Sequence, residues 1–194
     1  MDETAPSTAT TTANQQSSIG GLTDAERHLV GDLHVAVTLL GDPPPGYQYV
    51  NVLGLLLDVG RLFTPRPWPD GGTPPGEPGK CYTESVAWAW GSPDGLAYVE
   101  GVAWTGRFPL EHGWCSSADG LVLDPTWPVP AAAYLGLPVR ADAAAALMSE
   151  HGDRLLGYGT VCLDWLRTGV PGELLVDVGR QIPAELTRPT LQGL

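Results

Sequence analysis

A run of prolines and glycines over residues 64–79, TPRPWPDGGTPPGEPG, is the feature that most limits how this chain can fold. Proline removes a backbone donor and fixes φ, and the residue before a proline avoids helical geometry, so no regular element fits this stretch. The bias extends to the whole chain, whose 25 glycines and 19 prolines in 194 residues favour short elements joined by many loops. A loop this long inside a compact domain is often functional, and this one leads to Cys81.

Two helices are predicted before the loop. Thr23 and Glu26 have the spacing of a capping box, in which each side chain bonds the backbone amide of the other residue. Apolar residues then recur at helical spacing until Gly41, where prolines 43–45 follow. A second apolar run over about 47–60 predicts another helix, although a buried strand fits the same run.

Helices and strands alternate less regularly after the loop. Helices are predicted over 81–90 and 143–150, and strands over 96–104, 108–116 and 120–126. The last two strands flank Ser-Ala-Asp-Gly at 117–120, which is good hairpin-turn chemistry, while the type of the segments 161–166 and 173–178 stays open. This order predicts an α+β fold in which N-terminal helices and a cysteine-bearing helix pack on an antiparallel sheet.

The chain length favours a single domain, which we place over residues 22–194. Residues 1–21 are rich in Ser, Thr and Gln, hold almost nothing to bury and are expected to form a disordered tail. This N-terminus has neither the basic start nor the apolar centre of a signal peptide. The chain has three cysteines, an odd number without paired spacing, at Cys81, Cys115 and Cys162. We therefore expect the thiols to be reduced and the protein to be cytoplasmic.

The charge balance excludes some classes of partner. The net charge is −12 with only ten basic residues, so the chain lacks the basic face that nucleic acids or an anionic membrane surface would need. The sequence also has no run of about 18 apolar residues that would predict a membrane-spanning helix. An acidic surface favours a neutral or cationic substrate over an anionic one.

The hairpin over 108–126 brings a histidine and an aspartate together. If the turn is centred near 118–119, cross-strand partners have residue numbers that add up to about 236 or 237, and His112 lies opposite residue 124 or 125. Directly opposed Cβ atoms are roughly 4.5–5.5 Å apart, which lets Asp124 hydrogen-bond the imidazole and fix its tautomer. A nucleophile would complete this arrangement.

Cys81 is suited to that role because it begins a predicted helix. Amides at a helix start favour a negatively charged thiolate, and the neighbouring Lys80 acts in the same direction. The backbone amide of Cys81 can also donate to an oxyanion. The chain therefore presents Cys81, His112 and Asp124 in the order of a nucleophile, a base and an orienting acid.

Three short motifs carry a resemblance to a known family. GKC at 79–81, HGW at 112–114 and DPT at 124–126, over about residues 79–127, resemble the transglutaminase-like core of the papain-like cysteine enzymes. The resemblance implies acyl transfer or amide hydrolysis through a thioester, with Cys81 as nucleophile, His112 as base and acid, and Asp124 as the orienting residue. It also implies a small-molecule, peptide or protein amide as substrate and no cofactor. The superfamily contains transamidases, amide hydrolases, deamidases, acetyltransferases and non-catalytic relatives.

Further residues are candidates for contacts with the substrate. Trp114 shares a strand face with His112, and Trp127 follows Asp124 closely, so either tryptophan could form a wall of the cleft. A second oxyanion donor could come from Tyr82, from the Trp114 indole or from Gln48. Tyr82, Trp114 and Trp127 are therefore the predicted substrate-binding residues.

Two alternatives to an enzyme remain open. Glu84, one helical turn after Cys81, would oppose a thiolate and favours a catalytically silent binding or scaffold module of the same fold. A zinc site is the other, because Cys81, His112, Cys115 and Asp124 are all ligand types. His112 and Cys115 should point to opposite faces of a regular strand, and no Cys-X-X-Cys pair exists, so we expect no metal.

Overall fold

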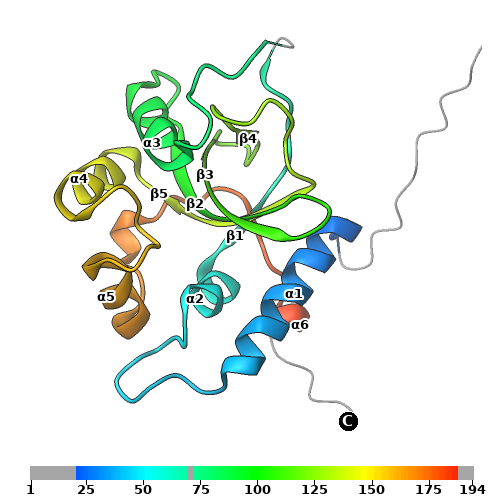
Figure 1. Cartoon of the computed structure of the whole chain (residues 1–194), viewed down its shortest axis with the longest axis vertical. Helices are drawn as coiled ribbons and strands as arrows, with labels where there is room; N and C mark the ends of the chain where they lie inside the picture. The colour runs from blue at the N-terminus through cyan, green and yellow to red at the C-terminus, as the bar shows by residue number, and fades with distance from the viewer. Residues whose placement is uncertain (1–20, 70–71, 188–194) are drawn as a thin grey trace, which may run out of the picture.

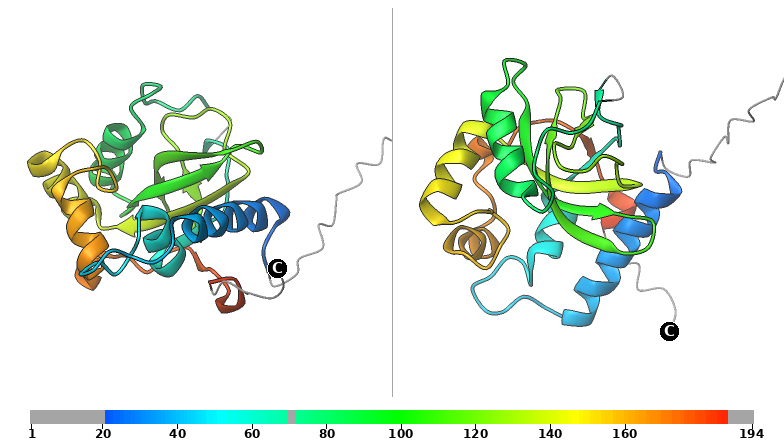
Figure 2. Two further views of the ribbon diagram at one scale, coloured as in Figure 1. Left: turned by 60° about the horizontal axis from the view of Figure 1, so that its bottom comes forward. Right: turned by 45° about the horizontal axis from the view of Figure 1, so that its top comes forward.

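A six-stranded antiparallel sheet forms the centre of the computed structural model, which describes residues 21–69 and 72–187 (Figure 1). The strand order is β4-β3-β2-β5-β1-β6. The strands are β1 (Arg61–Phe63), β2 (Ala97–Trp104), β3 (Pro109–Ser116), β4 (Val122–Leu123), β5 (Ala133–Val139) and β6 (Arg180–Gln181). The long strands β2, β3 and β5 lie next to one another, and Figure 2 shows how strongly they curl.

The main helices pack against one face of this sheet (Figures 1 and 2). They are α1 (Asp24–Leu40), α2 (Val52–Val59), α3 (Cys81–Gly91), α4 (Ala141–His151), α5 (Thr160–Thr168) and the short α6 (Ala184–Thr187), with a 3-10 turn, η2, at Gly172–Leu174. Helices α1 and α2 contact β5, α3 contacts β3, and α4 contacts α3. The predicted α+β class, with N-terminal helices and a cysteine-bearing helix on an antiparallel sheet, is confirmed.

Local signals set the ends of the first two helices. The Thr23 hydroxyl accepts a hydrogen bond from the Glu26 amide at 3.2 Å, and the Thr23 amide donates to the Glu26 carboxylate at 2.8 Å, so the predicted capping box is present. Helix α1 ends at Gly41, as predicted. Helix α2 is shorter than predicted because Asn51 caps it and the amides of residues 48 and 49 bond the Leu166 carbonyl instead.

The second half of the chain differs more from the sequence prediction. The prediction did not include β5, a central strand, because Gly136 and Pro138 interrupt its pattern. The predicted strand over 120–126 shortens to Val122–Leu123, since the chain turns at Asp124. The segment left open at 161–166 is helical, and the one at 173–178 contains η2. The tail predicted over 1–21 lies, except for residue 21, outside the described residues.

Each face of the sheet has its own core. Leu56, Tyr98 and Leu135 belong to the larger core beneath the helices. On the opposite face Trp114 is fully buried and makes edge contacts with Phe63 and Tyr134, with ring centroids 5.7 and 5.0 Å apart. This smaller core contains Trp114, and the His112 ring lies against the Trp114 ring.

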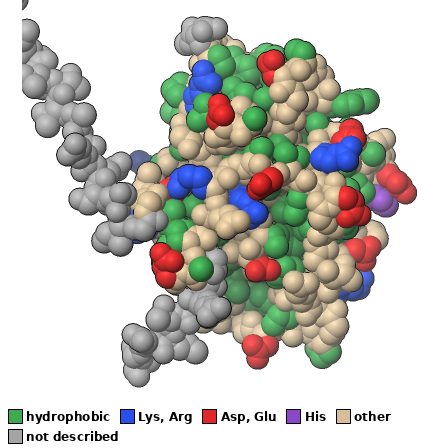
Figure 3. Space-filling model, turned by 180° about the vertical axis from the view of Figure 1, so that it is seen from behind, with side chains coloured by type: hydrophobic (Ala, Val, Ile, Leu, Met, Phe, Trp, Pro, Cys, Tyr) green, Lys and Arg blue, Asp and Glu red, His purple; other side chains and the backbone are tan. Residues whose placement is uncertain are grey.

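The surface agrees with the charge balance of the sequence. On the face shown in Figure 3, acidic and basic side chains of the described residues are intermixed and do not form one basic patch. Among the described helices, none has the length and apolar character needed to cross a bilayer.

Gly136 should be essential for packing because its missing side chain makes room for Trp114. A Cβ atom at position 136 would lie 2.6 Å from Cη2 of Trp114 and 2.7 Å from Cγ1 of Val99. We therefore expect Gly136→Ala to lower the free energy of unfolding by about 1–3 kcal/mol, measured by urea denaturation. Gly31→Ala is the control: position 31 lies on α1 with no atom within 4 Å of the new Cβ, and alanine there should be neutral or stabilising by up to about 1 kcal/mol. Equal effects of the two substitutions would contradict this account.

Candidate active site

His112 lies on β3, opposite Gly101 of β2. The side chains of β3 alternate, so His112 and Trp114 face the smaller core while Gly113 and Cys115 face α3. A Cβ atom on Gly113 would lie 3.0 Å from the Tyr82 ring and 3.3 Å from the carbonyl oxygen of Cys81. The glycine between His112 and Trp114 therefore lets the first turn of α3 approach the strand closely.

The hairpin register differs from the prediction. Cys115 pairs with Leu123 and Ser116 with Val122, so the residue numbers of partners add up to 238 rather than 236 or 237. The shift arises from a longer turn, in which Gly120 adopts a left-handed φ of 73°. Asp124 is thus not directly opposite His112 on a paired strand. It reaches the imidazole from the turn that follows β4.

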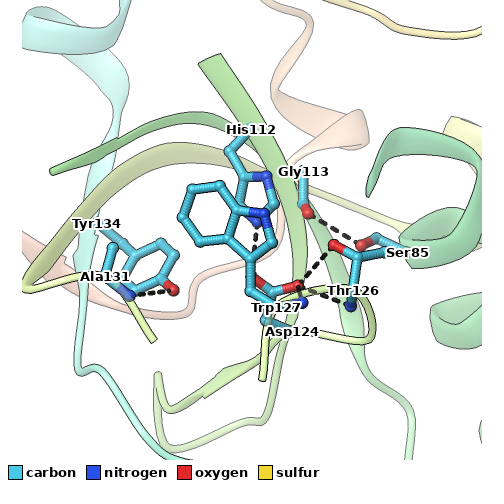
Figure 4. A network of polar contacts seen from close by, with 8 residues as sticks. All are labelled: Ser85, His112, Gly113, Asp124, Thr126, Trp127, Ala131 and Tyr134. Carbon is cyan, nitrogen blue, oxygen red and sulfur yellow. Dashed lines mark hydrogen bonds and ion pairs between the residues drawn. The ribbon is translucent and has the colours of Figure 1, made fainter. Parts of the chain in front are cut away.

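Asp124 nevertheless contacts His112 closely, and its two oxygens have separate partners (Figure 4). Oδ2 lies 2.6 Å from His112 Nε2. Oδ1 accepts hydrogen bonds from the Thr126 amide at 2.9 Å, the Thr126 hydroxyl at 3.0 Å and the Trp127 amide at 3.0 Å. Asp124 is therefore both a turn former and the partner of a buried imidazole.

Two tryptophans flank the imidazole. The Trp127 ring stacks on His112 with centroids 3.8 Å apart and planes inclined by 19° (Figure 4). Trp127 is partly exposed, so it covers the imidazole from the side of the solvent. Trp114 is fully buried with its centroid 6.2 Å from that of His112, and it supports the imidazole from within the core.

Cys81 is the first residue of α3 and is partly exposed. Its side chain lies close enough to His112 to raise the pKa of the imidazole. Cys81 and Asp124, two residues that the sequence singled out, therefore both lie near His112.

The charges around Cys81 are less favourable to a thiolate than the sequence suggested. Lys80 forms an ion pair with Glu77 at 2.7 Å, which offsets part of its charge. Glu84 packs against Gly76 of the proline-rich loop, since a Cβ atom at residue 76 would lie 3.2 Å from its Cβ and Cγ. The amides of the helix start remain close to Cys81, whose own amide has no i−4 acceptor within α3.

Ser85, one helical turn after Cys81, fixes α3 to β3 and was missed by the sequence analysis. Its buried hydroxyl donates to the Gly113 carbonyl at 3.0 Å (Figure 4). Its own carbonyl accepts a hydrogen bond from the Cys115 thiol at 3.2 Å. These bonds set the position of the cysteine helix relative to the histidine strand. A small polar residue four positions after a candidate nucleophile is the only sequence signal for this role.

The other oxyanion candidates lie in different surroundings. Gln48 bonds the Tyr49 hydroxyl at 2.9 Å and lies against Gly169, in a cluster that contains neither Cys81 nor His112. The Tyr82 hydroxyl is 3.5 Å from Arg154 Nη1. The Trp114 Nε1–H is buried and has no acceptor among the described residues. None of these contacts places a second donor at Cys81.

The zinc alternative has no geometric support in the described part of the chain. Within residues 21–69 and 72–187, no group of three or more His, Cys, Asp or Glu side chains is arranged to hold a metal ion. Cys115 points to the face of β3 opposite His112 and donates its S–H to Ser85.

Comparisons with protein-family models, curated proteins and solved structures found no match to this chain.

Removing the Ser85 hydroxyl should weaken the contact between α3 and β3. In Ser85→Ala the Gly113 carbonyl loses a buried partner, so we expect the free energy of unfolding to fall by about 1–3 kcal/mol in urea denaturation. Thr83→Ala is the matched control, since the Thr83 hydroxyl on the same helix is exposed and bonds only the Lys80 carbonyl at 3.2 Å. An unchanged midpoint for Ser85→Ala would show that this bond does not hold the helix.

The pKa of His112 should lie above its ordinary value of 6.5. Burial lowers this pKa, but the hydrogen bonds to Asp124 and Cys81 and the charges of these groups raise it by more. In Asp124→Asn the pKa should fall below the wild-type value, because burial persists while the charge is lost. Imidazole resonances in NMR titrations of the folded protein, compared with the urea-unfolded chain, measure both values.

The raised pKa of His112 also predicts how the stability of the protein changes with pH. A raised pKa in the folded state stabilises the protein below pH about 6.5, and this contribution is lost as the pH rises through the folded pKa. Asp124→Asn should flatten this part of the pH dependence. A folded-state midpoint for His112 at or below that of the unfolded chain would rule out the imidazolium–carboxylate pair.

Proposed function

We propose that the protein is a cysteine-dependent enzyme that performs acyl transfer or amide hydrolysis through a thioester. The observation that carries this proposal is the position of His112, a buried imidazole that hydrogen-bonds Asp124 and lies near Cys81, which raises its pKa. A nucleophile close to a base that an acidic residue orients is the arrangement that nucleophilic catalysis requires. The resemblance of the GKC, HGW and DPT motifs to the transglutaminase-like enzymes supports the same assignment.

The reaction follows from the contacts. His112 accepts the thiol proton of Cys81, and the thiolate attacks the carbonyl carbon of the amide. The tetrahedral intermediate collapses when the imidazolium returns the proton to the departing amine, which leaves a thioester on Cys81 and a free amine. Water or a second amine, deprotonated by His112, then attacks the thioester, and the proton passes back to the thiol.

Asp124 and Trp127 prepare His112 for this proton transfer. The Asp124 carboxylate fixes the ring and stabilises the imidazolium, and its other oxygen is held by Thr126 so that it cannot rotate away. Trp127 covers the ring and limits access of water to the hydrogen bond between Asp124 and His112. The backbone amide of Cys81 is the available donor to the oxyanion.

The net charge of the chain supports a proposal for the substrate class. The state of the cysteines supports one for the cellular compartment. With a net charge of −12, the surface favours a neutral or cationic amide, either a small molecule, a peptide or a protein. Cys81, Cys115 and Cys162 are all free thiols, which supports a reducing compartment such as the cytoplasm.

A catalytically silent module of the same fold is the second candidate. The Lys80–Glu77 ion pair and the presence of Glu84 one turn after Cys81 favour it, because both reduce the positive potential at the thiol. Thiol reactivity distinguishes the two candidates.

Cys81 should react with iodoacetamide much faster than the other two thiols. Burial raises the pKa of the Cys162 thiol to about 11 and raises that of Cys115 further, so both serve as internal references. We expect a rate at Cys81 at least about tenfold higher, which falls in His112→Ala because the base is lost. Peptide mapping by mass spectrometry after timed labelling gives the three rates separately.

Acylation by 4-nitrophenyl acetate adds a direct test of turnover. The wild type should release nitrophenolate and carry an acetyl group on Cys81, whereas His112→Ala should lose about 100-fold or more of this rate. Equal, slow labelling of all three thiols together with no acetylation would leave the silent module as the better description.

A further inference from the structure

A cavity of about 500 Å³ lies beside α3, on the side of the proline-rich loop. Trp88 of α3 and Trp68 of the loop form one wall, with ring centroids 5.6 Å apart in an edge contact. Leu96 and Leu123 also line the cavity, and Asp94 is the only charged residue among its described lining residues. The walls are therefore mainly apolar.

The cavity adjoins the candidate active site along two elements. Trp88 is seven residues after Cys81 on α3, which places it two turns further on the same side of the helix and about 10 Å away along the axis. Leu123 directly precedes Asp124. The loop that supplies Trp68 also joins the turn after β4, through the Gly76 amide, which donates to the Pro125 carbonyl at 2.7 Å.

The chemistry of the walls defines what can bind. Trp88 is 43% exposed although it lies at an apolar cavity, so its indole is accessible to a ligand from solvent. Aromatic and aliphatic walls of this size suit an uncharged apolar group, and the acidic rim at Asp94 disfavours an anion. An extended peptide advances about 3.3 Å per residue, so a distance of about 10 Å corresponds to three residues.

We propose that this cavity is a specificity subsite that binds an apolar side chain of a peptide substrate about three residues from the bond attacked by Cys81. The assignment rests on the proposed acyl-transfer function, since it takes Cys81 as the reacting group. It narrows the substrate class from any amide to a peptide with a large apolar residue at a fixed distance. The proline-rich loop contributes Trp68 and Pro69 to a wall of this subsite.

Binding can be measured without catalysis in the full-length Cys81→Ala protein. The probes are two peptides, acetyl-Phe-Gly-Gly-Gly amide and acetyl-Gln-Gly-Gly-Gly amide, titrated by isothermal calorimetry. Burial of the phenyl ring should make the phenylalanine peptide bind about tenfold or more tightly. Trp88→Gln, combined with Cys81→Ala, should abolish this preference. If that variant does not fold, Trp68→Gln removes the other tryptophan of the same wall and should have the same effect.

Trp90→Gln is the matched control. Trp90 lies on the same helix and is 68% exposed, but it lines a different hollow between α3 and α4. This variant should keep the preference for the phenylalanine peptide. Equal binding of the two peptides, or equal losses in Trp88→Gln and Trp90→Gln, would overturn the subsite.

Turnover of the 4-nitrophenyl esters of the two acetyl peptides by the wild type separates this inference from the proposed function. If the enzyme hydrolyses the phenylalanine ester about tenfold or more faster, judged by kcat/KM, both proposals gain support. If the peptides bind with the expected preference but neither ester acylates Cys81, the cavity remains a peptide-binding site and the acyl-transfer proposal fails.

Discussion

The buried carboxylate of Asp124 is the constraint from which the arrangement of the site follows. A charged group removed from water must be paired and hydrogen-bonded, and here one oxygen faces His112 while the other accepts three bonds from residues 126 and 127. The turn after β4 supplies those three donors. The same turn carries Trp127 onto the imidazole, so one aspartate organises the base, its cover and the end of the hairpin.

The position of the nucleophile depends on close packing between a helix and a strand. Gly113 allows α3 to approach β3, and Ser85 holds the two together by hydrogen bonds to residues of that strand. On the far side of the sheet, Gly136 leaves the space that the Trp114 ring fills behind His112. Small residues therefore set the distances between helix α3, the sheet and the Trp114 ring on the far face of the sheet.

A second buried carboxylate shows that burial alone does not mark a catalytic acid. Glu100 accepts hydrogen bonds from the Tyr98 hydroxyl and from the amides of Leu155 and Leu156, each at 2.8 Å. Burial raises its pKa, and the three bonds and Arg154 oppose that rise. Its two amide donors belong to the segment between α4 and α5, so Glu100 ties this segment to β2, and no histidine bonds it as His112 bonds Asp124 among the described residues. Asp124 differs from Glu100 in its hydrogen bond to His112, and not in its burial.

The sequence by itself determined the local elements and the identity of the candidate triad. The capping box at Thr23, the helix that begins at Cys81 and the hairpin turn before Leu121 depend on neighbours within a few residues, so their patterns were sufficient. Tertiary structure decided the rest. Strand β5 forms despite Gly136 and Pro138 because β2 and β1 pair with it on both sides. The roles of Ser85 and of the cavity at Trp88 likewise arise from contacts between segments far apart in the chain, which no local pattern encodes.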